Sequence, residues 1–221
     1  MLKAIATLFA ILLLATVTAD AQVCRLTATT KTVQGSVETT TKTTGTAFYI
    51  GHLPDGQSAW LAAGHLVEKE QTVVIEFEGS LVGKAIATSK TPDLALIAAP
   101  GVDATKHQRF VLADKDAADG AVVAMSGFSG LLPRDRHCSA DGYLHDGTML
   151  FCGLVDSGDS GGPVFHKNTL YGVVTGKVGA PNAPVVGNGP SARLNVVPVS
   201  QIRKWLLEIP ELQGDLGFLC D

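Results

Sequence analysis

The segment of this chain best suited to covalent chemistry is the glycine-rich sequence SGDSGGPVF around Ser160. A serine among glycines can lie in a tight turn that exposes its Oγ, and the glycines allow backbone N–H groups to point at a reacting carbonyl oxygen. A serine hydroxyl is a weak nucleophile, so it needs a neighbouring base and a third group that orients the base. The segment therefore predicts acyl transfer through Ser160, with the other two groups supplied from elsewhere in the chain.

Two further segments supply a base and an orienting carboxylate. The sequence SAWLAAGHL places His65 just after an apolar run of strand length, and TPDLAL places Asp93 at the start of another. Asp55 and Asp103 are the competing carboxylates, but both lie in turn or loop contexts. The order along the chain is therefore histidine, aspartate, serine, with contributions from both halves.

In this order and context, the three segments resemble those of the chymotrypsin/trypsin-like serine proteases, over roughly residues 45–209. The resemblance implies an endopeptidase in which Ser160 is the nucleophile, His65 the general base and Asp93 the carboxylate that orients the base. It also implies that the backbone N–H groups of Gly158 and Ser160 form the oxyanion hole. The reaction would pass through an acyl-enzyme and would use neither a metal nor an organic cofactor.

The sequence departs from the digestive members of that family in ways that indicate a compact relative of microbial or viral type. It shows no Arg/Lys-Ile-Val-Gly activation site, although activation in that family inserts a new N-terminus beside the acidic residue that Asp159 matches. The residue directly after His65 is not a cysteine, and only 28 positions separate His65 from Asp93. We therefore expect an enzyme that is competent once folded, with Asp159 held by donors within its own loop.

The resemblance also places residues around a substrate pocket. By their positions relative to Ser160, Leu154 is expected near the base of the pocket and Leu194 on its wall. Thr175 and Gly176 fall at the strand that pairs with an extended substrate in the family. Neither leucine supplies a carboxylate, so we expect apolar or small residues to be preferred before the scissile bond. Ordinary core packing is the alternative role for Leu154.

These residues need a rigid frame, and the sequence predicts one made of short β-strands. Residues 27–46 contain ten threonines, which is typical of a pair of half-exposed strands, with an O-glycosylated stretch as the alternative. One amphipathic helix is expected after Pro198, with Ser200 as its candidate N-cap and Pro210 as its stop. Apolar runs of strand length, separated by turn signals, occur at residues 46–50, 58–62, 72–77, 85–88, 94–98, 121–126, 148–154, 163–166, 170–175 and 193–197.

The strands fall into two sets of about six, joined by a polar linker at residues 112–120. This pattern predicts two small antiparallel β-barrels or sandwiches followed by a C-terminal α-helix. The resemblance to the chymotrypsin/trypsin-like proteases implies an all-β fold of two six-stranded antiparallel β-barrels with that helix at the C-terminus. The first barrel would comprise residues 22–112 and the second, with the helix, residues 121–221. The two halves would form one protease domain.

Composition limits the functional classes. The chain has 221 residues, of which 46% are hydrophobic and 17% charged, so it is not an intrinsically disordered protein. Its formal net charge of −4 argues against a strongly basic nucleic-acid-binding protein. We therefore expect no nucleic-acid partner, while the resemblance implies a peptide or protein substrate, no metal and a monomeric protein.

Residues 1–21 have the pattern of a secretory signal peptide. A lysine precedes an apolar run, and a small-x-small sequence ends at Ala21. An uncleaved anchor is the alternative, but the run is short for a bilayer span of about 20 residues. We expect a mature chain that begins at Gln22, is secreted to an extracellular or periplasmic location, and is not attached to a membrane.

The four cysteines suggest disulfides, because their number is even and the chain is predicted to be secreted. Three connectivities are possible. We expect Cys138–Cys152 across a local hairpin and Cys24–Cys220 between the two ends, with free or partly paired thiols as the alternative. The sequence contains no CxxC pair, so the cysteines do not predict a zinc site.

Two other functions compete with a secreted endopeptidase. A protease-like binding protein that has lost catalysis would usually lack one of the three reactive residues, and all three are present here. A stress protease with chaperone activity would carry a substrate-binding domain after the protease, whereas about a dozen residues follow the predicted helix. The sequence therefore favours the endopeptidase.

Overall fold

The structure is a computed structural model that describes residues 22–34, 37–129, 134–143, 146–178 and 192–212. The predicted signal peptide at residues 1–21 and the cysteine at position 220 lie outside the described residues. None of the helices within these ranges is long and apolar enough to cross a lipid bilayer.

Six strands form the first barrel, which closes in the order β1-β2-β3-β6-β5-β4 with every pair antiparallel. Apolar side chains alternate with polar ones along the strands and fill the barrel interior. In β4, for example, Val73 and Ile75 are buried while Thr72 and Glu76 are exposed. The strands are β1 (Val23–Gln34), β2 (Val37–His52), β3 (Ser58–Ala62), β4 (Thr72–Glu76), β5 (Leu81–Lys90) and β6 (Asp93–Ala99).

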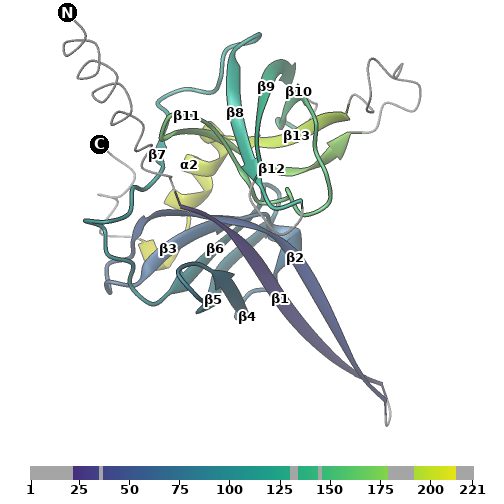
Figure 1. Cartoon of the computed structure of the whole chain (residues 1–221), viewed down its shortest axis with the longest axis vertical. Helices are drawn as coiled ribbons and strands as arrows, with labels where there is room; N and C mark the ends of the chain where they lie inside the picture. Colours follow the sequence, from purple (N-terminus) through teal and green to yellow (C-terminus); the bar gives the residue numbers. More distant parts are fainter. Residues whose placement is uncertain (1–21, 35–36, 130–133, 144–145, 179–191, 213–221) are drawn as a thin grey trace, which may run out of the picture.

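The first two strands form a hairpin that is longer than the barrel. β1 and β2 pair from Val23↔Phe48 to Gln34↔Val37 without a register shift. Only the base of the hairpin joins the barrel, and the rest projects from it as a two-stranded ribbon (Figure 1). The prediction of threonine-rich strands over residues 27–46 is confirmed.

A second group of strands has the order β11-β8-β9-β10-β13-β12, and pairing of β11 with β12 closes it into a six-stranded barrel. The predicted two-barrel fold is therefore confirmed. One extra strand, β7 (Val111–Leu112), pairs in parallel with β12. The barrel strands are β8 (Val122–Gly127), β9 (Arg134–Tyr143), β10 (Met149–Gly153), β11 (Pro163–His166), β12 (Thr169–Val178) and β13 (Ala192–Pro198).

The predicted C-terminal helix is α2 (Val199–Leu207), and a 3₁₀ turn, η2 (Pro210–Leu212), follows it. The helix packs Ile202, Leu206 and neighbouring apolar side chains into a core that strands of both barrels share. The prediction that Ser200 is the N-cap is wrong, because the N-cap position is Pro198. Ser200 instead donates its backbone N–H and its hydroxyl to Asp116, at 2.8 and 2.7 Å. A residue of the predicted linker thus holds the start of the helix.

The expected disulfide Cys138–Cys152 is not formed, although the two cysteines do lie on the paired strands β9 and β10. Cys152 is opposite Ser139, so Cys138 projects from the other face of the sheet. Cys138 is buried, whereas Cys152 is exposed and its Sγ contacts Asp141. Cys24 is buried and forms no disulfide with the other cysteines of the described ranges.

Candidate active site

His65 and Asp93 are brought together by the pairing of β3 with β6. His65 lies in a single 3₁₀ turn, η1 (Gly64–Leu66), just after β3, and Asp93 is the first residue of β6. The pair Ala62↔Ala95 aligns the ends of these two strands. As a result, Asp93 Oδ1 accepts the backbone N–H of His65 at 2.7 Å, and Asp93 Oδ2 lies 2.7 Å from His65 Nδ1.

This contact fixes the state of the imidazole. An ionised carboxylate only accepts hydrogen bonds, so His65 Nδ1 must carry the shared proton and Nε2 is left to act on another group. The hydrogen bond to Asp93 raises the pKa of His65 above its ordinary value, partly opposed by burial of the ring. The His65 side chain is still 44% exposed, so it is accessible from solvent. The pair thus has the arrangement of a base with its orienting group.

Gly64 directly precedes His65, and the structure shows why a glycine is needed there. A Cβ at this position would lie 2.3 Å from the carbonyl oxygen of Ser89 and 2.9 Å from Asp93 Oδ1. Both distances are far below van der Waals contact. The absence of a side chain at Gly64 therefore allows Asp93 to approach the backbone of His65.

Ser160 lies in the tight loop between β10 and β11 that the sequence predicted. Gly158 has φ = +100°, and a Cβ there would lie 2.2 Å from the carbonyl oxygen of Phe128, so glycine is required. Within the described residues, the N–H groups of Gly158 and Ser160 donate to no other backbone or side-chain group. Both donors are therefore available to a reacting carbonyl oxygen.

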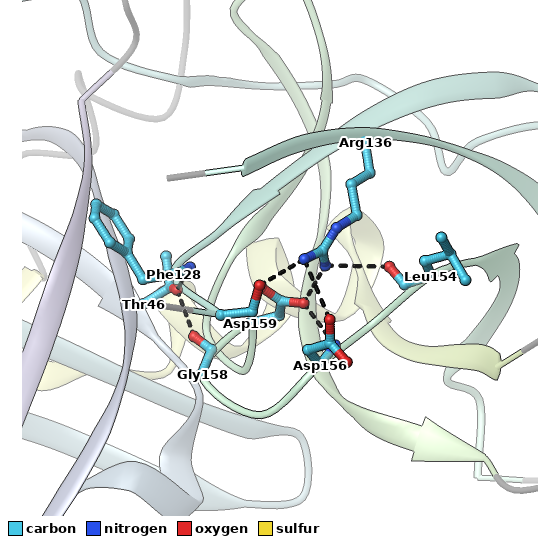
Figure 2. Close-up of polar contacts among 8 residues, drawn as sticks. Thr46, Phe128, Arg136, Leu154, Asp156, Gly158 and Asp159 are labelled. Carbon is cyan, nitrogen blue, oxygen red and sulfur yellow. Dashed lines mark hydrogen bonds and ion pairs between the residues drawn. The ribbon is translucent and has the colours of Figure 1, made fainter. Parts of the chain in front are cut away.

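Thr46 of β2 anchors this loop from the first barrel. Its N–H donates to the carbonyl oxygen of Ser160 at 2.8 Å, and its Oγ1 donates to that of Gly158 at 2.8 Å. The same Oγ1 accepts the N–H of Phe128 at 3.0 Å, as Figure 2 shows in part. Sequence reasoning missed Thr46; the available signal was a polar residue opening an apolar strand, and the side chain is indeed fully buried.

The same strand places Ser160 at the end of the barrel where His65 lies. The residue after Thr46 is Ala47, which pairs with Ala62, three residues before His65. Among the described residues, no hydrogen bond joins Ser160 Oγ to the His65 ring. In unliganded active sites such bonds are often long and tighten when substrate binds.

Asp159 is fully buried and forms an ion pair with Arg136 of β9 (Figure 2). Its Oδ2 accepts both Arg136 Nη1 and the backbone N–H of Asp156, the latter at 2.7 Å. Arg136 also donates to Ser129 Oγ at 2.6 Å and to the carbonyl oxygen of Leu154 at 3.3 Å. The expected donor within the loop is therefore present, but the charged partner comes from another strand and was missed.

The two leucines that were expected to line a substrate pocket do not line one in the structure. Leu194 is completely buried in the core of the second barrel, so its assignment to the wall of an open pocket is wrong. Leu154 is 56% exposed and is neither a pocket floor nor packed in the core. Thr175 is half-buried, with its Oγ1 3.4 Å from the carbonyl oxygen of Asn195, and a Cβ at Gly176 would meet nothing within 4 Å. Of the four positions, only Gly176 of β12 has open space beside its backbone in which a substrate could lie.

The described ranges contain no group of three or more histidine, cysteine, aspartate or glutamate residues arranged to hold a metal ion. A base oriented by a carboxylate lies at the same barrel end as a loop that carries a serine and two N–H donors, which are the groups that acyl transfer requires.

No protein-family model and no curated protein matches the sequence. Solved structures do match in fold. The active form of the Rv3671c protease from M. tuberculosis has a TM-score of 0.64 and 18% sequence identity, over 90% of this chain and 85% of that chain. Its inactive form has a TM-score of 0.63 and 18% identity, over 87% and 90%. A serine endoprotease from Yersinia pestis has a TM-score of 0.62 and 14% identity, over 86% of this chain but 62% of the other. The chain therefore has the two-barrel fold of the chymotrypsin-like serine proteases.

Proposed function

We propose that this protein is a serine endopeptidase that hydrolyses peptide bonds with Ser160, His65 and Asp93. One observation carries the proposal: Asp93 holds His65 through two 2.7 Å contacts, at the barrel end that also anchors the Ser160 loop. The fold shared with solved serine proteases supports the same conclusion.

In the proposed reaction, Ser160 Oγ attacks the carbonyl carbon of the scissile bond while its proton passes to His65 Nε2. The resulting oxyanion accepts hydrogen bonds from the N–H groups of Gly158 and Ser160. The His65 proton then passes to the leaving amine, the C–N bond breaks, and an acyl-enzyme remains on Ser160. A water molecule, deprotonated by His65, hydrolyses this ester and restores the serine.

We further propose that the enzyme is competent as soon as it folds. The ion pair with Arg136 and the Asp156 N–H give Oδ2 of the carboxylate that precedes Ser160 two donors without any newly cleaved N-terminus, while its buried Oδ1 has no hydrogen-bond partner among the described residues. The loop can then hold its N–H donors in place with no separate activation step. We also propose that the protein is secreted after removal of residues 1–21, on the basis of the signal-like sequence, and that it acts as a monomer.

The test is labelling with a fluorophosphonate, which reacts covalently with an activated serine. Full-length protein should be labelled, and Ser160→Ala should not be, while both show the same folded circular-dichroism spectrum. Cleavage of an unfolded protein such as reduced casein should follow the same pattern, with a loss of up to about 10⁶ in kcat for Ser160→Ala. Absence of labelling in the folded wild-type protein would favour a catalytically inactive binding protein.

A further inference from the structure

A cleft of about 320 Å³ lies where the chain between β6 and β8 crosses from the first barrel to the second (Figure 1). It shares no residue with the candidate active site. Its volume is at the lower end of the range for pockets that hold small molecules. Its walls include Tyr49 of β2, the stretch from β6 to β7 at Ala104, His107, Arg109 and Val111, and Asn168 of the turn between β11 and β12.

Backbone hydrogen bonds hold one wall of the cleft against both barrels. The N–H of Phe110 donates to the carbonyl oxygen of Tyr49 at 3.2 Å, and the N–H of Val111 donates to that of Asn168 at 2.9 Å. Phe110 itself is buried in the core that the two barrels share. Neighbouring side chains of an extended chain point in opposite directions, which turns Arg109 and Val111 to the cleft. The fold therefore fixes these walls in place.

The segments that meet at the cleft are rich in cationic side chains. Residues 104–111 and 163–170 contain two lysines, one arginine, two histidines and no acidic residue, in a chain with a formal net charge of −4. Burial raises the pKa of Tyr49, and the charge of Arg109 opposes that shift, so the half-buried guanidinium lies near the Tyr49 wall. A guanidinium has five N–H donors, more than one partner can use, and two of them together match a carboxylate. The cleft is therefore suited to an anion.

Tyr49, Ala104 and Val111 give the cleft its apolar walls. The Tyr49 hydroxyl is already engaged, because it lies 2.9 Å from His52 Nδ1, and His52 Nε2 lies 2.8 Å from the carbonyl oxygen of Val102. A carbonyl oxygen only accepts, so His52 Nε2 carries the proton and Nδ1 accepts from the tyrosine. Tyr49 thus presents its ring to the cleft, where an apolar group packs well.

His107 is held in the wall by contacts outside the cleft. Its ring packs edge-on against Phe77, with centroids 4.8 Å apart, and its Nε2 lies 3.5 Å from Glu78 Oε1. The Glu78 side chain is 68% exposed, so solvent screens its charge. Glu78 is engaged at His107, and the charge of Arg109 is left as the main attraction for an anion in the cleft.

We propose that this cleft binds a small organic acid, with its carboxylate on Arg109 and its flat apolar body against Tyr49 and Val111. One guanidinium matches one carboxylate, and the apolar body removes the apolar walls from water. The site goes beyond the proposed catalytic function and does not depend on it. A bound acid touches the first barrel, the connecting segment and the second barrel together, so its binding stabilises the docked arrangement of the two barrels.

Isothermal titration calorimetry with benzoate tests the chemistry of the site. Benzamide has nearly the same shape without the charge, and inorganic phosphate has charge without an apolar body. With the full-length protein we expect benzoate to bind with a Kd of about 1 mM or lower, and about tenfold or more tightly than either of the other two. Equal affinity for benzoate and benzamide, or no measurable binding of benzoate, would overturn the proposal.

A pair of charge variants tests the role of Arg109. Arg109→Gln should weaken benzoate binding by about tenfold or more. Lys106→Gln removes the same charge from an exposed residue of the same segment that is not in the cleft walls, and it should keep the wild-type Kd. An equal loss in both variants would attribute the binding to general charge attraction and refute the site.

A second pair of variants fills the cleft and leaves Arg109 intact. Ala104 is exposed, so a larger side chain there does not disturb the core. Ala104→Trp should abolish benzoate binding, whereas Thr105→Trp, at the next exposed residue outside the walls, should not. Circular dichroism checks that both variants are folded. Full binding by folded Ala104→Trp would show that benzoate does not occupy the cleft.

Amide NMR signals locate the bound probe, in Ser160→Ala as well as in the wild-type protein. Benzoate should shift the signals of Phe110 and Val111 and leave those of Gly158 and Gly161 unchanged. Shifts confined to the serine loop would mean that benzoate binds at the candidate active site, and would overturn the proposal. None of these measurements uses peptide hydrolysis, so failure of the catalytic proposal and failure of this one are distinguishable.

Discussion

Arg136 and Asp159 form a buried ion pair that ties β9 to the residue immediately before Ser160. The Asp159 side chain is completely buried and that of Arg136 is 14% exposed, so neither charge is well solvated. The backbone N–H of Asp156 adds a second donor to the same carboxylate oxygen. Removing one partner from such a pair leaves the other buried and uncompensated, which is strongly unfavourable.

The first prediction is that Arg136→Met lowers the free energy of unfolding by about 3–5 kcal/mol and greatly reduces the fraction of active sites. Urea denaturation and burst titration with an acylating ester measure the two effects. Arg134→Met is the matched control, since Arg134 is an exposed residue of the same strand, and it should change neither quantity. Combining Arg136→Met with Asp159→Asn should recover part of the lost free energy of unfolding. If Arg136→Met alone leaves both the free energy of unfolding and the fraction of active sites unchanged, the ion pair does not support the loop.

The second prediction concerns the contact of Asp93 with His65. Asp93→Asn should lower kcat by about 10⁴, because an amide in place of the carboxylate favours the wrong imidazole tautomer. The backbone N–H of His65 can still donate to the Asn oxygen, so the fold should persist in circular dichroism. Steady-state kinetics on a peptide ester measures the loss, and a decrease of less than about tenfold would exclude Asp93 as the orienting group.

The third prediction is the pH dependence of turnover. His65 must be neutral to accept the Ser160 proton, so kcat/KM should rise as pH increases through the pKa of His65. Because the hydrogen bond to Asp93 raises that pKa, the midpoint should lie above the ordinary histidine value of about 6.5. The residual activity of Asp93→Asn should have a lower midpoint. A profile that is flat between pH 5 and 9 would contradict a histidine base.

The fourth prediction is that Gly64→Ala impairs both folding and catalysis. Its methyl group would lie 2.3 Å from the Ser89 carbonyl oxygen, so the backbone beside His65 must shift. We expect kcat to fall by tenfold or more, and the free energy of unfolding to fall by about 1–3 kcal/mol. Gly176→Ala is the control for stability, because its added Cβ meets nothing within 4 Å. Equal unfolding curves for the two variants would show that the close approach at Gly64 is relieved without strain.

The elements around His65 and Asp93 were predictable because each reactive residue adjoins an apolar run of strand length. Those runs pair in register, so their ends meet, and local sequence was sufficient to identify both. β9 was missed for the opposite reason. Its sequence RDRHCSADGY is largely polar, and only Cys138 and Ala140 are buried, so no apolar run marks the strand. The Arg136 partner of Asp159 was lost with it.

The disulfide and pocket predictions failed where sequence alone does not determine which face of a strand a side chain occupies. Cys138 and Cys152 are on neighbouring strands, but a register offset of one residue puts their thiols on opposite faces. Leu194 was assigned from its distance along the chain to Ser160, while its direction on β13 sends it into the barrel. In each case the pairing register decides the outcome, and it is visible only in three dimensions.

Because Thr46 joins the first barrel to the Ser160 loop, the rate of peptide hydrolysis depends on how the two barrels pack against each other. One side chain and one N–H from the first barrel hold two carbonyl groups of the loop that carries Ser160 in the second. A slight separation of the halves would release these bonds while the strands of each barrel stay paired. On heating, peptide hydrolysis should therefore disappear at a lower temperature than the β-sheet signal in circular dichroism, and Thr46→Val should widen that interval.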